Sequence, residues 1–142
     1  MGNPFVHVEL ATDDLVKAKK FYTNLFDWKL EEVPSMEYSM VNVGEGTGGG
    51  MMKNMVPGMI SHWLPYVLVT DVAASTKKAK SLGATIAKDV TEVSNFGWFS
   101  IIIDPTGAAL GLWETSARCY RSWSWWMCSS TVIVWPSIMC LT

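Results

Sequence analysis

The first 114 residues contain no cysteine, and the last 28 contain no aspartate or glutamate. The chain as a whole also lacks an excess of either charge, because 11 Lys and Arg stand against 13 Asp and Glu for a net charge of −2. A nucleic-acid-binding protein normally carries a basic surface, so nucleic acid is not an expected partner. With 142 residues, 49% hydrophobic and 17% charged, the chain has the composition of a globular domain rather than of a disordered segment.

The composition changes near residue 115. The segment 115–142 holds all three cysteines, at Cys119, Cys128 and Cys140, and no histidine. This spacing contains no CxxC pair and predicts neither a zinc site nor a dithiol redox site. Residues 122–142 are uncharged over about the length of a membrane span, but five Ser, two Thr and one Pro interrupt them, and no membrane partner is expected. We therefore predict a domain at 1–114 and an atypical C-terminal extension at 115–142 that the fold does not need.

The N-terminal residues show no basic region followed by an apolar run, which is the pattern of a secretory signal. The expected location is therefore the cytoplasm.

The first half of the body predicts a strand, a helix and three further strands. Residues 5–11 are rich in aromatic and β-branched side chains, and residues 14–26 place apolar side chains at helical spacing with lysines on the opposite side. Thr12 and Asp13 offer N-cap oxygens to this helix. The three strands are expected at 28–33, 37–43 and 49–54.

The same order recurs in the second half. A strand at 63–69 is followed by the cap Thr70-Asp71 and by a helix at 72–82, which Gly83 ends. Further strands are expected at 84–90, 97–103 and 108–114, with a turn at 104–107. The sequence therefore predicts an α+β domain of two βαβββ modules, 5–54 and 63–114.

Three segments carry a resemblance to a known family. They are VHVELATDDLVKAKKFYTNLFDW near the start, WLPYVLVTDVAASTKKAKSLGA in the middle and DPTGAALGLWE at the end. In this order, on a duplicated βαβββ frame, they resemble the vicinal oxygen chelate superfamily, the glyoxalase/bleomycin-resistance/dioxygenase group, over about 5–114. The resemblance implies that the two modules curl into a half-open barrel with the site in its concave cleft.

The resemblance also implies where a metal would bind. Metal-using members of the superfamily hold a divalent ion on His and Glu side chains from the first and last strands of each module. The matching positions here are His7 in the first module, Tyr66 and Gly111 in the second, and one of Gly50, Met51 or Met52 in the first. One usual ligand of three or four remains, and a single imidazole cannot fix a catalytic ion.

We therefore expect no metal cofactor, with a divalent metal ion as the open alternative. If an ion is bound, its ligands are expected to be His7, Glu9 and Tyr66, since Glu9 shares the strand face of His7. His7 and Glu9 are also the candidate catalytic residues. The ordinary alternative for His7 is a buried, hydrogen-bonded imidazole.

The expected cleft is apolar and aromatic with a small polar cluster. The predicted ligand-binding residues are His7, Glu9, Met52, Tyr66, Leu68, Gly111 and Trp113. Such a lining suits a planar or hydrophobic small molecule. The predicted function is therefore a metal-free small-molecule-binding protein that takes an aromatic or amphipathic compound. The alternative is a metal-dependent lyase, isomerase or dioxygenase of the same superfamily.

Exposed sheet edges predict a homodimer. Six of the nine methionines lie within 36–59 and either make one side of the cleft adaptable or fill an irregular core. The glycine-rich segment 44–50 lacks the ending of a phosphate-binding loop and is expected to be a hairpin loop. His62 is expected in the loop before the strand at 63–69.

Overall fold

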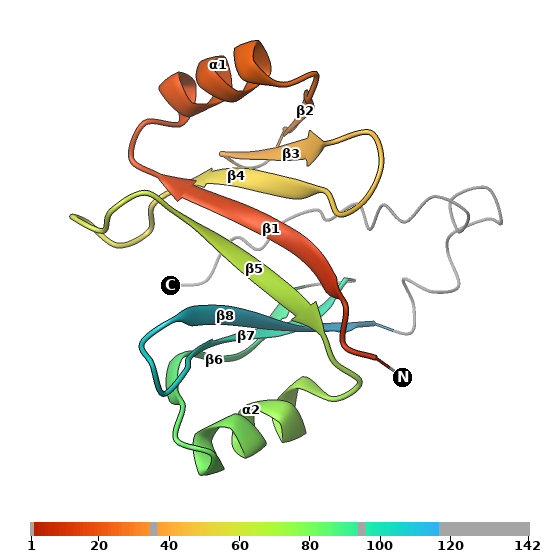
Figure 1. Ribbon diagram of the computed structural model, residues 1–142, viewed down its shortest axis with the longest axis vertical. Coiled ribbons are helices and arrows are strands. Elements are labelled where there is room, and N and C mark those ends of the chain that lie inside the picture. Colours follow the sequence, from red (N-terminus) through yellow and green to blue (C-terminus); the bar gives the residue numbers. More distant parts are fainter. Residues whose placement is uncertain (1, 35–36, 94–95, 117–142) are drawn as a thin grey trace, which may run out of the picture. The chain divides into compact units, whose positions relative to one another are not determined.

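The computed structural model describes residues 2–34, 37–93 and 96–116 (Figure 1). Apart from Thr115 and Ser116, the predicted C-terminal extension lies outside the described residues. The chain divides into two compact units. The first unit comprises the described part of 7–64, and the second comprises 2–6 together with the described part of 65–116. No helix within these ranges is long and apolar enough to cross a membrane.

The first unit contains a βαβββ module, as predicted. Its elements are β1 (Phe5–Thr12), α1 (Leu15–Leu25), β2 (Lys29–Val33), β3 (Tyr38–Asn42) and β4 (Gly49–Lys53), with the first two residues of β1 assigned to the second unit. The strand order is β2-β3-β4-β1. β4 pairs in parallel with β1 and antiparallel with β3, and β3 pairs antiparallel with β2.

The second unit repeats this order. Its elements are β5 (His62–Leu68), α2 (Val72–Ser81), β6 (Thr85–Val93), β7 (Gly97–Ile103) and β8 (Ala109–Thr115), with the first three residues of β5 assigned to the first unit. The strand order is β5-β8-β7-β6, with β5 and β8 parallel and the other pairs antiparallel. The α+β class and the duplicated βαβββ pattern are therefore confirmed.

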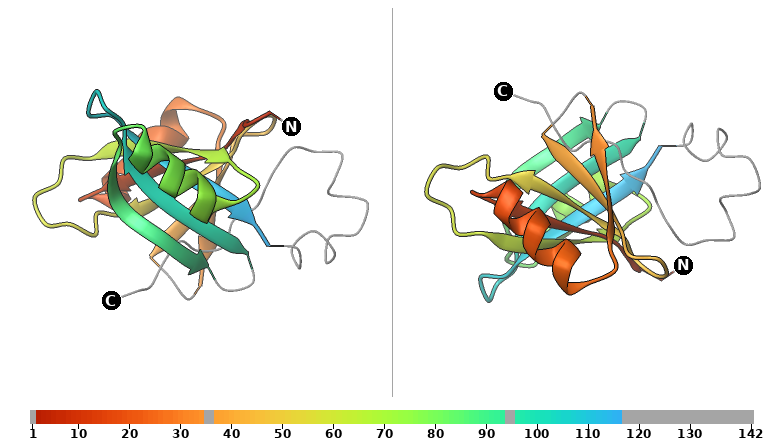
Figure 2. Two further views of the ribbon diagram at one scale, coloured as in Figure 1. Left: turned by 90° about the horizontal axis from the view of Figure 1, so that it is seen from below. Right: turned by 90° about the horizontal axis from the view of Figure 1, so that it is seen from above.

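Each unit has a core between its helix and one face of its strands. In the first unit, the alternation of β1 sends Leu10 toward the helix, where it packs with Val41 and Met51. Leu15, Ala18 and other half-buried apolar side chains complete this cluster, and α1 crosses the strands of its unit in the right-hand view of Figure 2. Met51 is completely buried, so this methionine fills the core.

The core of the second unit lies under α2, which crosses β6 and β7 in the left-hand view of Figure 2. Val69, Val72, Ile102 and Leu112 are its buried members. Beside them, the hydroxyl of Thr76 hydrogen-bonds to that of Ser100 at 2.6 Å and donates to the Val72 carbonyl at 2.6 Å. The hydroxyl pair satisfies two polar groups that would otherwise weaken an apolar core.

The first helix begins one residue later than predicted. Its N-cap is Asp14, whose carboxylate accepts from the backbone N–H of Lys17 at 2.9 Å. Thr12 instead ends β1, and Asp13 accepts from the side-chain amide of Asn54 at 2.9 Å. The N-cap of α2 is Asp71, as predicted.

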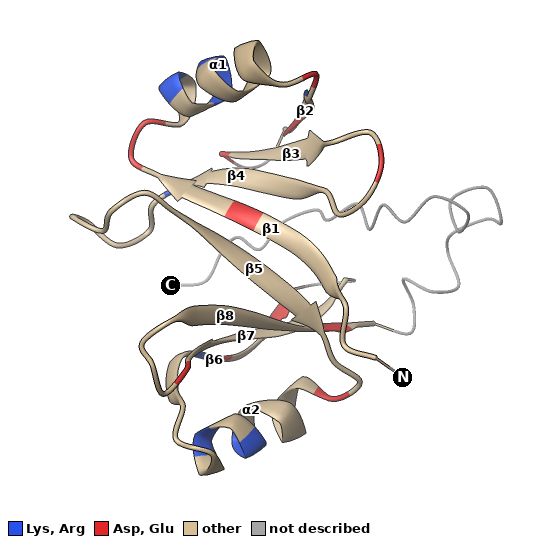
Figure 3. Ribbon diagram, in the orientation of Figure 1, with Lys and Arg blue, Asp and Glu red and all other residues tan. Residues whose placement is uncertain are grey.

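The outer faces of both helices carry lysines, as Figure 3 shows. On α1, however, the apolar stripe is wider than the strip that packs on the strands. Phe21 and Leu25 are 57% and 55% exposed although they share the helical spacing of the buried stripe. The apolar side of α1 is therefore only partly covered by the strands.

Other boundaries also differ from prediction, and β8 ends at Thr115, one residue into the predicted C-terminal extension. β6 continues through Val93 instead of ending at Val90. His62 is the half-buried first residue of β5, with Nδ1 at 2.8 Å from the Ile60 carbonyl, so its placement in a loop is wrong. The glycine-rich residues 44–48 do link β3 to β4, which agrees with the predicted hairpin.

Candidate functional site

A buried polar cluster lies on the face of the first unit opposite α1. It contains His7 and Glu9 from β1 and Tyr38 from β3, and each side chain is at most 4% exposed. The Tyr38 hydroxyl lies 2.9 Å from His7 Nε2 and donates to Glu9 Oε2 at 3.3 Å. The sequence-predicted pair His7 and Glu9 is therefore joined through a third residue.

The hydrogen bonds assign a direction to this cluster. Since the Tyr38 O–H donates to Glu9, the Tyr38 oxygen accepts the N–H of His7 Nε2. His7 Nε2 therefore carries a proton in this arrangement. Burial lowers the pKa of His7 from 6.5 to about 4, because desolvation disfavours the imidazolium. The neutral, donating form is thus the form at neutral pH.

Gly50 lies directly beside this cluster. It pairs with Glu9 across β1 and β4, and with Met40 across β4 and β3. A side chain at Gly50 would collide with the hydroxyl end of the Tyr38 ring. Tyr38 therefore occupies the space that a larger residue at position 50 would need.

The second unit repeats this relationship at Gly111. Tyr66 and Gly111 are directly paired across β5 and β8, and a side chain at Gly111 would collide with the Tyr66 ring. Leu68 and Trp113 form the next pair on the same face. Tyr66 also meets Phe99 edge to face, at 6.4 Å between ring centres. Alternation placed these four predicted residues on one face correctly.

Most of the predicted ligand-binding residues are buried. Tyr66 is completely buried, Trp113 and Met52 are 2% and 6% exposed, and Leu68 is half-buried. Met52 lies opposite Tyr38 in the β3–β4 pairing, on the side of Gly50. The structure thus divides the predicted set into a first-unit group around Tyr38 and a second-unit group around Tyr66, and their role in ligand binding stays a prediction.

The positions that the resemblance assigns to metal ligands do not form a ligand set within either unit. Gly50 and Gly111 have no donor atom, and a tyrosine ring fills the space beside each of them. Across residues 2–34, 37–93 and 96–116, no three His, Cys, Asp or Glu side chains are grouped so that they could hold a metal ion. His7 and Glu9 both bond to Tyr38 instead. These residues do not fit the implied metal site, and the absence of a bound metal stays a prediction.

Tyr38 was not among the residues predicted for the site. Its segment was predicted as a strand, but nothing local indicated that its side chain would reach across β4 to residues about thirty positions earlier. The available signal was the pair of glycines at 49 and 50 in an apolar strand, because a glycine in a strand interior often marks the close approach of another group.

Sequence comparison identifies relatives of this chain. The profile of the bleomycin resistance protein-like N-terminal family matches residues 4–44. A protein named as a glyoxylase, CFP32, of Mycobacterium tuberculosis is 36% identical over 117 residues, which are 77% of this chain and 44% of that protein. The anthracycline biosynthesis protein DauV of a Streptomyces species is 23% identical over 75% of this chain and 45% of its own length. The chain thus spans less than half the length of these curated relatives.

Solved structures share the fold. A hypothetical protein from Bacillus halodurans has a TM-score of 0.60 at 15% identity, over 82% of this chain and 96% of its own. Methylmalonyl-CoA epimerase from Mycobacterium tuberculosis has a TM-score of 0.59 at 16% identity, over 82% and 90% of the two chains. Homoprotocatechuate 2,3-dioxygenase from Brevibacterium fuscum has a TM-score of 0.57 at 18% identity, over 79% and 36%.

The repeated βαβββ pattern, the matching profile, the mycobacterial relative and the shared fold all agree with the family expected from the sequence. The chain belongs to the vicinal oxygen chelate superfamily, the glyoxalase/bleomycin-resistance/dioxygenase group.

Proposed function

We propose that this chain is a small-molecule-binding member of the superfamily that works without a catalytic metal. It takes an aromatic or amphipathic compound, and it acts as a homodimer in the cytoplasm. One observation carries the proposal: the Tyr38 hydroxyl bonds to both His7 and Glu9 and fills the space beside Gly50.

This arrangement supports binding over metal chemistry. A metal ion at His7 and Glu9 has to displace the Tyr38 hydroxyl from both side chains, and Gly50 brings no donor to replace it. A catalytic ion needs three or more protein donors in a defined geometry. Tyr66 is placed against Gly111 in the same way, so the second unit adds no carboxylate at that position either.

The chemistry of the predicted contact set supports an aromatic or amphipathic ligand. In the first unit, Met52 offers apolar surface, and His7 and Glu9 offer polar groups that can orient a ligand. In the second unit, Tyr66, Leu68 and Trp113 offer ring and apolar surface. Because most of these side chains are buried, entry of a ligand requires them to move. The unbranched side chain of Met52 is suited to such a rearrangement.

The names of two relatives suggest probes. The matching profile is named for bleomycin resistance, and DauV is named for anthracycline biosynthesis. Bleomycin and an anthracycline such as daunorubicin are both large compounds with planar aromatic parts. They are therefore the first compounds to test.

The alternative function is a metal-dependent lyase, isomerase or dioxygenase. The observation that favours it is His7 at a ligand position of the family, with Glu9 on the same strand face, together with structural neighbours named as an epimerase and a dioxygenase. At 16% and 18% identity, those neighbours show the shared fold alone.

Titration of daunorubicin and bleomycin against the purified chain, followed by tryptophan fluorescence, tests the proposal. We expect saturable quenching by at least one compound, recovery of that compound unchanged, and weaker binding by Tyr66→Ala. Trp98→Phe is the matched control, because Trp98 packs in the apolar core under α2. Turnover that a chelator or Glu9→Gln abolishes would instead establish the enzymatic alternative.

A further inference from the structure

Two consecutive glycines in β4 each leave a gap in the row of side chains across the first unit. Gly49 lies between Val8 of β1 and Val41 of β3, whereas Gly50 lies between Glu9 and Met40. Neighbouring residues of a strand face opposite sides of the sheet. The two missing side chains therefore leave one hollow on each face, and Tyr38 fills the hollow at Gly50.

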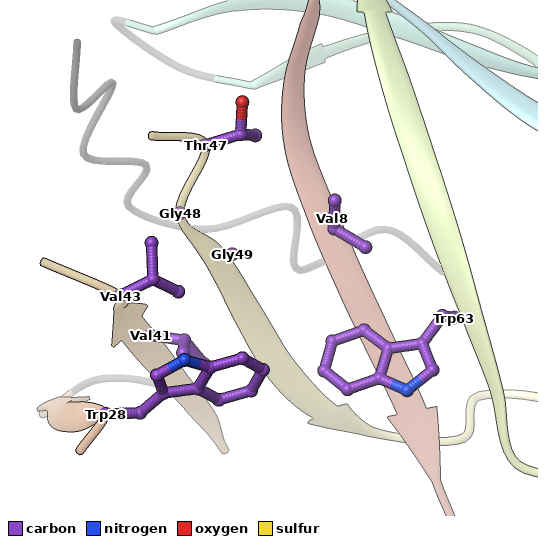
Figure 4. Close-up of a pocket in the computed structure, with 8 residues that line it drawn as sticks. All are labelled: Val8, Trp28, Val41, Val43, Thr47, Gly48, Gly49 and Trp63. Carbon is purple, nitrogen blue, oxygen red and sulfur yellow. The ribbon is translucent and has the colours of Figure 1, made fainter. Parts of the chain in front are cut away.

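The hollow at Gly49 is open. It forms a pocket of about 220 Å³. The pocket lies on the face that carries α1, since Val41 belongs to the core cluster under that helix, and Figure 4 shows the residues that line it. Val8, Gly49 and Val41 form the floor, and the indole rings of Trp28 and Trp63 form the walls. None of the residues lining the pocket belongs to α1, so the helix leaves this end of the face uncovered.

Backbone atoms leave no room for a side chain at the floor of the pocket. A side chain at Gly49 would collide with the Val8 carbonyl oxygen, and a Cβ at Gly48 would lie 3.0 Å from the Val41 carbonyl oxygen. Glycine is therefore required at Gly49 by the close approach of β1 and β4. The hollow is a fixed feature of this strand pairing.

The ring of Tyr22 contacts both indoles that form the walls of the pocket. Tyr22 stacks on Trp28 at 5.6 Å between ring centres, and its hydroxyl accepts the indole N–H of Trp63 at 3.2 Å. The two indoles meet nearly at right angles, at 84° and 6.3 Å. A planar ring in the pocket can therefore stack, offset, on one indole and meet the other edge to face, the two geometries that aromatic pairs prefer.

We propose that this pocket binds a neutral, planar aromatic compound of one or two rings. An apolar protein cavity of roughly 150 Å³ already accommodates benzene, so a pocket of 220 Å³ has room for a ring or a fused pair. Its lining contains no charged side chain, which disfavours an ionised ligand because burial would remove the ion from water without a partner.

This site is independent of the proposed function. It lies on the face of the sheet opposite His7, Glu9 and Tyr38, and it shares no lining residue with the predicted ligand-binding set. The Tyr66→Ala variant is therefore expected to leave it intact, which separates failure of one proposal from failure of the other.

Indole is the probe for this pocket. On full-length, isotope-labelled protein, we expect saturable chemical-shift changes at the indole N–H of Trp28 and Trp63 and at the amides of Gly48 and Gly49. Indole-3-carboxylate, which carries a charge, and cyclohexanol, which has no aromatic ring, are expected to bind at least tenfold more weakly. Val43→Trp places a ring at the rim of the pocket and should reduce indole affinity at least tenfold, whereas Trp98→Phe in the other unit should leave it unchanged.

The wild-type spectra decide the proposal even if Val43→Trp does not fold. Absence of saturable shifts, shifts confined to residues outside the pocket, or equal binding of indole and cyclohexanol would overturn it. So would a folded Val43→Trp variant that binds indole as tightly as the wild type.

Discussion

The hydroxyl of Tyr38 occupies the position that a side chain at Gly50 would have to take. The ring of Tyr66 has the same relationship to Gly111 in the second unit. In each unit, a bulky ring and a residue without a side chain are therefore fitted to one another. The effect of a substitution at one member of a pair on the free energy of unfolding should therefore depend on which residue occupies the other position, because residues in contact do not contribute independently to stability.

The Tyr38 hydroxyl should stabilise the first unit. Tyr38→Phe removes the partner that His7 Nε2 and Glu9 Oε2 share, and a buried polar group that loses its partner costs about 1–3 kcal/mol. Urea denaturation should show a loss of this size. Tyr22→Phe is the control, since its hydroxyl serves the exposed ring of Trp63, and it should cost less. Equal losses of unfolding free energy in the two variants would mean that the buried hydrogen bonds of Tyr38 stabilise the fold no more than the exposed one of Tyr22.

The pairing of Tyr66 with Gly111 should appear as a coupling energy. Gly111→Ala forces a methyl group against the Tyr66 ring and is expected to cost about 1–3 kcal/mol by overpacking. In a Tyr66→Val background, the same change should cost at least about 1 kcal/mol less. Gly2→Ala, where nothing lies within 4 Å, should leave the free energy of unfolding unchanged. Strict additivity of the two substitutions in urea denaturation is the contrary result.

Stability should depend on pH through His7. In the unfolded chain, His7 becomes protonated below about pH 6.5. In the folded chain its pKa is lowered to about 4, so that it becomes protonated only below about pH 4. Between these values the unfolded state binds more protons, so stability falls as the pH falls from 6.5 to 4 and changes no further below both values. The expected loss is about 3 kcal/mol.

The difference between wild type and His7→Gln isolates this contribution from that of the carboxylates. Urea denaturation of both proteins between pH 4 and 7 should give a shallower slope for the variant. Identical slopes for wild type and His7→Gln would show that His7 titrates normally.

The repeat and its alternation were visible in the sequence because both depend on local patterns. Apolar spacing located α1 and α2, and period-two alternation placed Tyr66 with Leu68 and His7 with Glu9 on common faces. The cap of α1 was misplaced because Thr12, Asp13 and Asp14 are all suitable residues in succession. In the structure the side chains of Thr12 and Asp13 hydrogen-bond to Ser61 and Asn54. Asp14 is therefore the residue that caps the helix.

Local patterns could not predict which side chains meet on each face of the strands of the first unit. The Tyr38 cluster and the Gly49 pocket both depend on the register of β1 against β4, which joins Val8 to Gly49 and Glu9 to Gly50 across some forty residues. A shift by one residue would exchange the two faces. No local pattern in either strand fixes that register.

The same register allows a metal site to be built within the first unit. Tyr38→Ser with Gly50→Glu removes the obstructing ring and adds a carboxylate next to Glu9 and near His7. The metal-free variant should be destabilised by a few kcal/mol, since it buries an unpaired charge. Added Zn²⁺, Co²⁺ or Ni²⁺ should then raise its Tm, because a ligand that binds only the folded state stabilises it.

Tyr38→Ser alone is the matched control for this design. It opens the same space but leaves two donors, so its Tm should not respond to the metals. If the single variant responds as strongly as the double variant, the added carboxylate is not a ligand. If neither responds while both fold, residue 50 does not reach His7 and Glu9.

We propose that the wild-type chain functions without a bound metal ion. Elemental mass spectrometry of protein incubated with excess Mn²⁺, Fe²⁺, Ni²⁺ and Zn²⁺ and then dialysed measures this. We expect substoichiometric metal in the wild type and no change in His7→Ala. One equivalent of a transition metal in the wild type that is lost in His7→Ala would contradict it.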